Sequence, residues 1–175
     1  MTREKGTTMH ASAKPIWDIS GKTSWIDHGP NPRFAILHTA TSPAGDAVLD
    51  KETGLVWQRA AGSKKTSLQA AVVAATTAVV TGRKGWRLPA IEELLSLVDP
   101  AASNPTLPAG SPFVDVQLDY FYWSLTRGLP MPTEQNLVWG YDFGSGNTSS
   151  IVVSLAQCYV WLVRGGYGHN YVLTI

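Results

Sequence analysis

The hydrophobic period of the chain changes along its length, and this change limits the folds that it can adopt. Apolar residues recur at helical spacing within 67–82 and again within 91–98. After residue 119 the period drops to two, in four segments between 120 and 164 that are rich in aromatic and β-branched residues. Helices followed by strands, rather than alternating with them, predict an α+β fold with antiparallel sheets.

Both predicted helices have recognisable end signals. Ser67 can cap the start of the first helix, and Gly82 can end it in a left-handed conformation. Pro89 suits the first turn of the second helix, and Pro100 stops it. The apolar face of this second helix is predicted to consist of Ile91, Leu94, Leu95 and Val98.

A hairpin is predicted ahead of the helices. Its apolar arms, 48–49 and 55–57, flank the turn-forming stretch D-K-E-T-G. A second tight turn, G-S-G-N at 144–147, joins two of the later strands. Residues 1–33 read as an irregular extension with a polar, poorly ordered start, so the folded domain is predicted to span 34–175.

Size and charge exclude several classes of protein. A chain of 175 residues suits one domain with a sizeable core. Its net charge of +1 gives no field that would attract nucleic acid, and no apolar run reaches transmembrane length. No apolar stretch follows the basic start, so no Sec-type signal peptide is expected. We expect synthesis in the cytoplasm, and a final place on a cell surface or virion stays open.

The reactive side chains show no catalytic or metal-binding pattern. Cys158, the only cysteine, lies in a strand-like run without a neighbouring cation, so we expect a buried, inert thiol. No known catalytic motif is present, and the histidines have no ligand spacing to one another. We therefore expect a protein that is not an enzyme and that needs no cofactor or metal. The four histidines are His10, His28, His38 and His169.

The run Y-V-W-L-V-R-G-G at 159–166 conflicts with simple alternation. In a strand, Trp161 and Arg164 would point to opposite faces. Either one face buries a cation, or the other exposes a tryptophan to water.

A series of motifs in fixed order resembles a known family. L-D-K-E-T-G-L-V-W-Q-R, G-W-R-L-P-A-I-E-E-L-L-S-L-V-D-P, F-Y-W-S-L-T, V-W-G-Y-D-F-G-S-G and Y-V-W-L-V-R-G-G are similar to motifs of the Lcl C-terminal-like domains, bacterial domains named after a collagen-like adhesin. The similarity extends over 46–166. It implies a C-type lectin-like fold of the formylglycine-generating-enzyme type, in which two helices pack on antiparallel sheets and a loop-rich region presents the ligand site.

Departures from the relatives refine this expectation. The oxygen-dependent formylglycine-generating enzymes use a pair of cysteines, and this chain has only one, so we do not expect their chemistry. The tripeptides E-P-N, Q-P-D and W-N-D of calcium-dependent sugar-binding lectins are also missing, so we do not expect calcium-assisted sugar binding. The family usually ends nearer to Y-x-R-x-V-R, with arginine where this chain has Trp161. The resemblance thus implies that Trp161 faces outward, and that Arg164 is a scaffold residue held by backbone carbonyls or Asp142.

The resemblance also directs the functional expectation. Domains of this kind serve as variable proteins of diversity-generating retroelements, which rewrite codons near the C-terminus. We expect a non-enzymatic ligand-recognition module that binds a protein or glycan through a C-terminal strand and loop surface. The alternative is a structural or assembly domain of a phage or cell-surface complex, with oligomer contacts. The expected ligand contacts are Arg127, Tyr141, Ser149, Val153, Gln157, Trp161, Tyr167, His169 and Tyr171, and the expected scaffold residues are Trp57, Trp86, Leu88, Ile91, Leu94, Leu95, Val98, Trp123, Phe143, Leu162 and Arg164.

Overall fold

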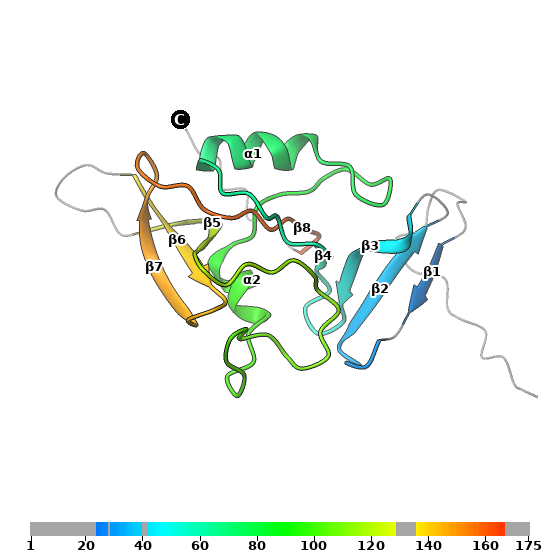
Figure 1. The fold of residues 1–175 in the computed structure, drawn as a ribbon. Helices are drawn as coiled ribbons and strands as arrows, with labels where there is room; N and C mark the ends of the chain where they lie inside the picture. The colour runs from blue at the N-terminus through cyan, green and yellow to red at the C-terminus, as the bar shows by residue number, and fades with distance from the viewer. Residues whose placement is uncertain (1–23, 28, 40–41, 129–135, 167–175) are drawn as a thin grey trace, which may run out of the picture.

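The computed structural model of the chain describes residues 24–27, 29–39, 42–128 and 136–166 (Figure 1). Within them the fold is α+β, as the sequence predicts, with two short helices and two antiparallel sheets. Neither helix has the length and apolar character needed to cross a bilayer. The elements are β1 Ser24–Asp27, β2 Phe34–Thr39, β3 Ser42–Asp50, β4 Val56–Gln58, α1 Leu68–Thr77, α2 Ile91–Ser96, β5 Tyr122–Arg127, β6 Leu137–Asp142, β7 Asn147–Val152 and β8 Val163–Arg164.

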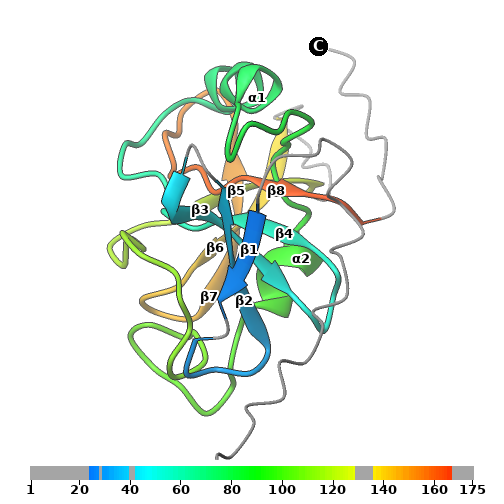
Figure 2. The ribbon, with the colours of Figure 1, turned by 90° about the vertical axis from the view of Figure 1, so that its right-hand side faces the viewer.

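The two sheets lie on opposite sides of the molecule (Figure 1). The five-stranded sheet has the order β1-β2-β3-β4-β8, and the three-stranded sheet is the meander β5-β6-β7. Helix α2 lies between the sheets and contacts β5 and β6, and α1 covers the top of the molecule (Figures 1 and 2). Because β8 pairs with β4, the end of the described chain returns to the first sheet.

Several predicted elements are confirmed. The β3–β4 hairpin forms around the turn at 51–54, and β6 and β7 pair around the glycine-rich turn at 143–146.

The extension to residue 33 is not irregular throughout, because β1 pairs with β2 at the edge of the sheet. Strand β2, to which the sequence assigned no element, is buried along its whole length and therefore shows no alternation.

Helix α1 begins as predicted but ends early. The hydroxyl of Ser67 accepts a hydrogen bond from the backbone N–H of Ala70 at 3.3 Å, which confirms the N-cap. The helix ends at Thr77 rather than at Gly82, and Val79 lies outside it with 56% of its surface exposed. The hydroxyls of Thr76 and Thr77 bond carbonyls of the preceding turn, a competition that weakens a helix rich in β-branched residues.

Helix α2 is shorter than its apolar pattern suggested. Ile91 and Leu94 are buried, and the C-capping Leu97 is fully buried just beyond the helix. The spacing of these buried residues turns Leu95 away from the core, where it is 41% exposed. The assignment of Leu95 to the core is therefore wrong. Val98 is half-buried and packs against the core.

The core consists of two hydrophobic clusters joined by the segment 158–163. Trp161 and Val163 belong to the cluster that also contains Trp57 and Phe143. Cys158 and Leu162 belong to the second cluster, which includes the buried face of α1 and Trp123. Both faces of the segment are thus buried, which resolves the apparent conflict in the sequence: the tryptophan is inside, and the arginine comes after the buried run.

Candidate functional site

Trp161 is a core residue, and the expectation that it faces outward is wrong. Its side chain has no exposed surface, and its indole Nε1 donates a hydrogen bond to the backbone carbonyl of Gln58 at 2.8 Å. Its ring packs edge-on against the rings of Trp57, Phe113 and Phe143. The segment has apolar neighbours on both faces, so no face remains for a ligand.

Tyr141 is also buried, with 2% of its surface exposed. Its hydroxyl shares a hydrogen bond of 3.1 Å with the hydroxyl of Thr106, and its ring packs against Phe143. This residue anchors β6 within the first cluster, so the expectation that it contacts a ligand is wrong for this fold.

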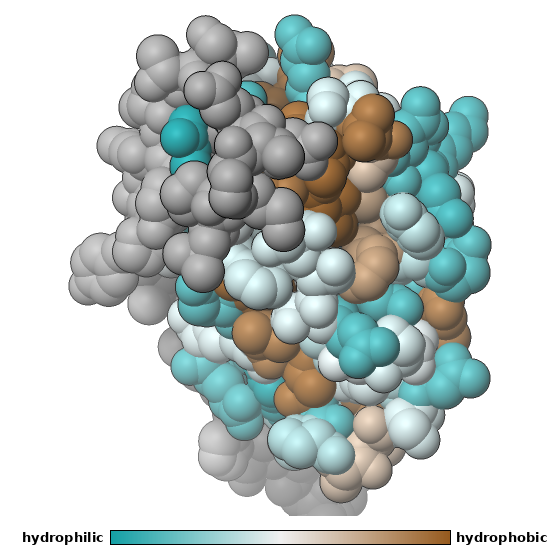
Figure 3. Space-filling model, turned by 90° about the vertical axis from the view of Figure 1, so that its left-hand side faces the viewer, coloured by the Kyte–Doolittle hydropathy of each residue, from teal (hydrophilic) through white to brown (hydrophobic). Residues whose placement is uncertain are grey.

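The remaining expected contacts do not converge on one cavity. Arg127 ends β5 and is exposed, and Gln157 is exposed in the segment between β7 and β8. Ser149 and Val153 are half-buried, and Val153 packs against the second cluster. Figure 3 shows the side of the molecule on which the three-stranded sheet lies, where apolar residues reach the surface beside polar ones. Tyr167, His169 and Tyr171 lie outside the described residues.

Leu155 is the most exposed large apolar residue of the described chain, at 79%. It belongs to the tight turn after β7, in which its backbone N–H donates to the carbonyl of Val152 at 3.2 Å. Nothing in the sequence predicts a functional role for this residue. Gln157 follows two positions later, so an exposed apolar group and an exposed amide stand close together in the chain.

Arg164 is half-buried, but it does not pair with Asp142. The Asp142 carboxylate instead caps the turn after β6, where it accepts from the backbone N–H of Gly144 at 2.9 Å and from the hydroxyl of Ser145 at 2.6 Å. Arg164 contributes through its backbone, in register with Val56.

Arg33, rather than Arg164, has a guanidinium that is anchored in the interior. Its Nη2 and Nε lie 2.7 and 2.8 Å from the two carboxylate oxygens of Asp50, and Nη2 also donates to the carbonyl of Ser96 at 2.6 Å. Burial would raise the pKa of Asp50, but hydrogen bonds from Arg33, Thr53 and the backbone N–H of Glu52 outweigh it and lower the pKa. This pair joins the residue before β2 to the ends of β3 and α2.

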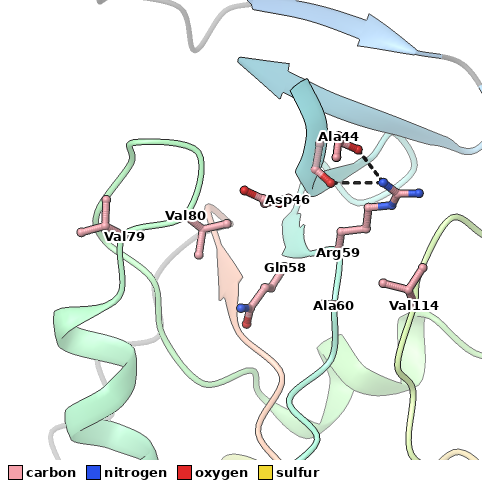
Figure 4. A pocket seen from close by; sticks show the side chains of 9 residues that line it. Ala44, Asp46, Gln58, Arg59, Ala60, Val79, Val80 and Val114 are labelled. Atoms are coloured by element: carbon pink, nitrogen blue, oxygen red, sulfur yellow. Dashed lines mark hydrogen bonds between the residues drawn. The ribbon is translucent and has the colours of Figure 1, made fainter. Parts of the chain in front are cut away.

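A concave site lies beside the β3–β4 pair (Figure 4). It has a volume of about 370 Å³ and is formed by four segments that are distant in the sequence. Valine side chains stand on both sides of a strand floor, with Val79 and Val80 on one side and Val114 on the other (Figure 4). We call this site the β3–β4 cleft, and the described residues that line it are Ala44, Gly45, Asp46, Gln58, Arg59, Ala60, Val79, Val80 and Val114.

Arg59 holds the walls of the β3–β4 cleft together. Its Nη1 donates to the carbonyls of Ala44 at 2.6 Å and Gly45 at 3.3 Å, and its Nε donates to the carbonyl of Pro112 at 3.1 Å. Gly45 has a φ of +77°, and a Cβ there would clash with the side chain of Ile36. The sequence thus needs a glycine where the carbonyls turn toward the guanidinium.

Two polar side chains of the β3–β4 cleft keep hydrogen-bonding capacity. Asp46 is exposed, and within the described part of the chain only its Oδ2 is engaged, by the hydroxyl of Ser42 at 2.5 Å. The side-chain amide of Gln58 makes no hydrogen bond to the described residues, although both of its backbone groups are used. Besides the guanidinium of Arg59, which is bound to backbone carbonyls, the cleft therefore offers one carboxylate and one amide between apolar walls. Trp161 supports this floor from the core, through the carbonyl of Gln58.

No residue of the β3–β4 cleft was among the contacts expected from the sequence. Its members come from separate segments, and neither strand nor helix periodicity relates them. The D-K-E-T-G hairpin could have indicated that residues 46 and 58 lie near each other, because a hairpin pairs its arms. Nothing in the sequence indicated that Val79, Val80 and Val114 would join them.

A charged aromatic cluster lies on the surface. Lys65 Nζ is 3.1 Å from Asp119, which also accepts the hydroxyl of Tyr159 at 2.8 Å. The ammonium lies over the rings of Tyr120 at 4.5 Å and Tyr159 at 5.1 Å. Hydrogen bonds from Tyr159 and Lys65 lower the pKa of Asp119. The charges satisfy one another, so we assign this cluster to the attachment of the 63–66 loop.

Cys158 is fully buried, and burial raises the pKa of its thiol to about 12. The thiolate, which is the nucleophilic form, is thus disfavoured at neutral pH. Among the described residues, no group of three or more histidine, cysteine, aspartate or glutamate side chains is arranged to hold a metal ion.

The fold and the cleft define a small α+β domain with two antiparallel sheets and a partly polar concave site. Residues 46–164 match the family model of the Lcl C-terminal domain, and the chain belongs to this family. The match confirms the resemblance drawn from the ordered motifs. Neither a curated protein nor a solved structure shows significant similarity to the chain.

Proposed function

We propose that this domain is a non-enzymatic recognition module with a C-type lectin-like fold, and that it binds a protein ligand. The observation that carries the proposal is the β3–β4 cleft, in which Asp46 and Gln58 keep free hydrogen-bonding capacity between valine walls. A concave, mostly apolar site with a few convergent polar groups is the usual form of a ligand site. The buried, weakly acidic Cys158 thiol supports the non-enzymatic reading.

The composition of the cleft favours a cationic side chain on an apolar stem. The valines can contact methylene groups, as apolar surfaces do with the stem of lysine. The free oxygen of Asp46 and the amide oxygen of Gln58 can accept from an ammonium. Among the described residues no aromatic ring lines this cleft, so they provide no stacking platform for a sugar. We therefore favour a protein ligand with a lysine over a glycan.

A nuclear magnetic resonance titration of the isotope-labelled chain tests this function. N-acetyl-lysine-methylamide should shift the amide signals of Gly45, Asp46 and Gln58, and N-acetyl-norleucine-methylamide, which lacks the charge, should shift them less. Asp46→Asn should reduce the difference between the two probes, because the amide oxygen still accepts a hydrogen bond but carries no negative charge to attract the ammonium. Asp27→Asn, at an exposed carboxylate of β1, is the matched control and should preserve the difference. Equal shifts with both probes on the native chain would refute the cationic preference.

A second candidate surface is the segment after β7, because Leu155 is so exposed there. The expected contacts Val153 and Gln157 lie two residues on either side of Leu155, and we propose that a retroelement diversifies this segment. The encoding locus tests the diversified form: a reverse transcriptase and a near-repeat of the 3′ end should lie nearby, and their absence would argue against diversification.

A further inference from the structure

Strand β7 ends the three-stranded sheet, and the hydrogen bonds of β6 show which of its backbone groups face outward. The backbone N–H of Gly128 donates to the carbonyl of Leu137 at 2.8 Å, so Leu137 faces β5. Both backbone groups of one residue point the same way in an antiparallel pair, so the neighbouring residues of β6, Val138 and Gly140, face β7. The bond from Val153 N–H to the carbonyl of Asn136, at 2.9 Å, agrees with this pattern.

The register then separates the residues of β7 into two sets. Ser149 and Ile151 pair with Gly140 and Val138, so their backbone groups face β6. Thr148, Ser150 and Val152 face the outer edge. The carbonyl of Val152 is occupied, because it accepts from the N–H groups of Leu155 and Ala156 at 3.2 Å each.

The backbone groups of Thr148 and Ser150 therefore form an open edge. The contact found there among the described residues is that of the Ser149 hydroxyl with the carbonyl of Ser150, at the limiting distance of 3.5 Å. Thr148 is exposed, and Ser150 is half-buried. Two donors and two acceptors thus stay available for another strand.

This edge lacks the usual protection against strand addition. Native edge strands carry lysine, proline or a bulge, or are very short. Strand β7, N-T-S-S-I-V, holds no charge, proline or glycine, and it pairs with β6 without a bulge over six residues. A row of free backbone groups on an uncharged strand is a template for pairing.

We propose that β7 pairs antiparallel with β7 of a second copy of this chain. Pairing about a twofold axis at Ser149 places Thr148 of each copy opposite Ser150 of the other. All four outward N–H groups of the two copies then donate to outward carbonyls, and a continuous six-stranded sheet results. Because the strand is uncharged, no like charges oppose each other across the new interface.

A second copy fits this edge better than a foreign peptide does. Strand addition obtains its sequence specificity from pockets that receive alternate side chains of the peptide. Neither described cavity reaches β7, since one is the β3–β4 cleft and the other lies beside residues 31–33. Self-pairing needs only the twofold match of the backbone groups. The side chains of β7 are small, so the contact area is small and the dimer should be weak.

Two proline substitutions separate the edge from the fold. Ser150→Pro removes an outward N–H, so the monomer should keep nearly its native melting temperature while the dimer weakens about tenfold or more. Ser149→Pro removes an inward N–H that bonds to β6, so the melting temperature itself should fall. Thr148→Lys, at an exposed side chain, places a charge on the edge and is the second dimer-breaking variant.

Sedimentation velocity of the full chain, from micromolar to near-millimolar concentration, measures the association. The native chain should shift from monomer toward dimer as concentration rises, and Ser150→Pro and Thr148→Lys should both stay monomeric while circular dichroism shows them folded. Thr76→Lys, on the exposed side of α1, is the control and should dimerise like the native chain. A native chain that stays monomeric throughout, or a dimer that both folded edge variants leave unchanged, would overturn the proposal.

Discussion

At the scale of single residues, Trp161 shows how burial decides between a recognition and a structural role. Trp161 has no exposed surface, and it holds the floor of the β3–β4 cleft through the carbonyl of Gln58. Trp161→Ala should lower the free energy of unfolding by about 3–5 kcal/mol, because it leaves a large cavity. Urea unfolding measures this loss.

The matched control for that substitution is Leu155→Ala. Leu155 is 79% exposed, so its truncation should change stability by less than about 0.5 kcal/mol. A Trp161→Ala chain of native stability that had lost ligand binding would contradict the structural assignment and restore Trp161 as a recognition residue.

The Arg33–Asp50 pair predicts an acid-sensitive fold. Arg33→Ala leaves the buried Asp50 carboxylate without its cation and should cost about 3–5 kcal/mol at neutral pH. The pKa of Asp50 is lowered in the folded state, so its stabilisation is present above the unfolded carboxyl value of about 4 and is lost as the pH falls through the folded value. The stabilities of the native chain and Asp50→Asn should therefore converge toward low pH in thermal melts. A constant gap between them would contradict this role.

The Cys158 thiol should be unreactive in the folded chain. Its pKa is raised to about 12 and its side chain is buried, so a disulfide reagent at pH 8 should label it only as the chain unfolds. Labelling rates measured against urea concentration test this. Rapid labelling of the native chain would contradict the burial, and an activity abolished by alkylation of the folded chain would contradict the non-enzymatic proposal.

At the scale of elements, the apolar and polar residues of a strand alternate only where one face is buried and the other meets solvent. The β3–β4 hairpin and the start of α1 follow their sequence signals, because turns or caps mark their ends. Strand β2 and the segment 158–163 are buried on both faces, so they gave no alternation or a misleading one. The early end of α1 depends on threonine hydroxyls that compete for backbone carbonyls, which the distant Gly82 could not indicate.

The start of β3 depends on the glycine at position 45. Gly45→Ala places a side chain at φ +77° and against Ile36, so it should destabilise the fold by about 1–3 kcal/mol and disturb the bonds of Arg59. Gly54→Ala is the matched control: its φ of +72° is similar, but no atom lies within 4 Å of the added Cβ. Thermal melts should show a larger loss for Gly45→Ala, and equal losses would contradict the steric part of this account.

At the scale of the whole molecule, the candidate site is harder to predict than the fold class. Helical spacing and strand period each report a local property, and together they indicated an α+β domain. The β3–β4 cleft instead depends on the meeting of the hairpin with residues 79–80 and 114, a tertiary contact without a local pattern. The expected contacts follow from residue type near the C-terminus, but two of them, Tyr141 and Trp161, are aromatic because they fill the core.

The segment 158–163 should make the two hydrophobic clusters unfold together. Its alternate side chains belong to both clusters, so neither cluster can lose its packing while the other keeps this segment in place. Tryptophan fluorescence reports on both clusters, through Trp57 and Trp161 in the first and Trp86 and Trp123 in the second. Urea unfolding followed by this fluorescence should coincide with unfolding followed by far-ultraviolet circular dichroism. Leu162→Ala in the second cluster and Val163→Ala in the first should each shift both transitions by the same amount. Separate midpoints would show that the clusters are independent units, and the connecting role of this segment would then be wrong.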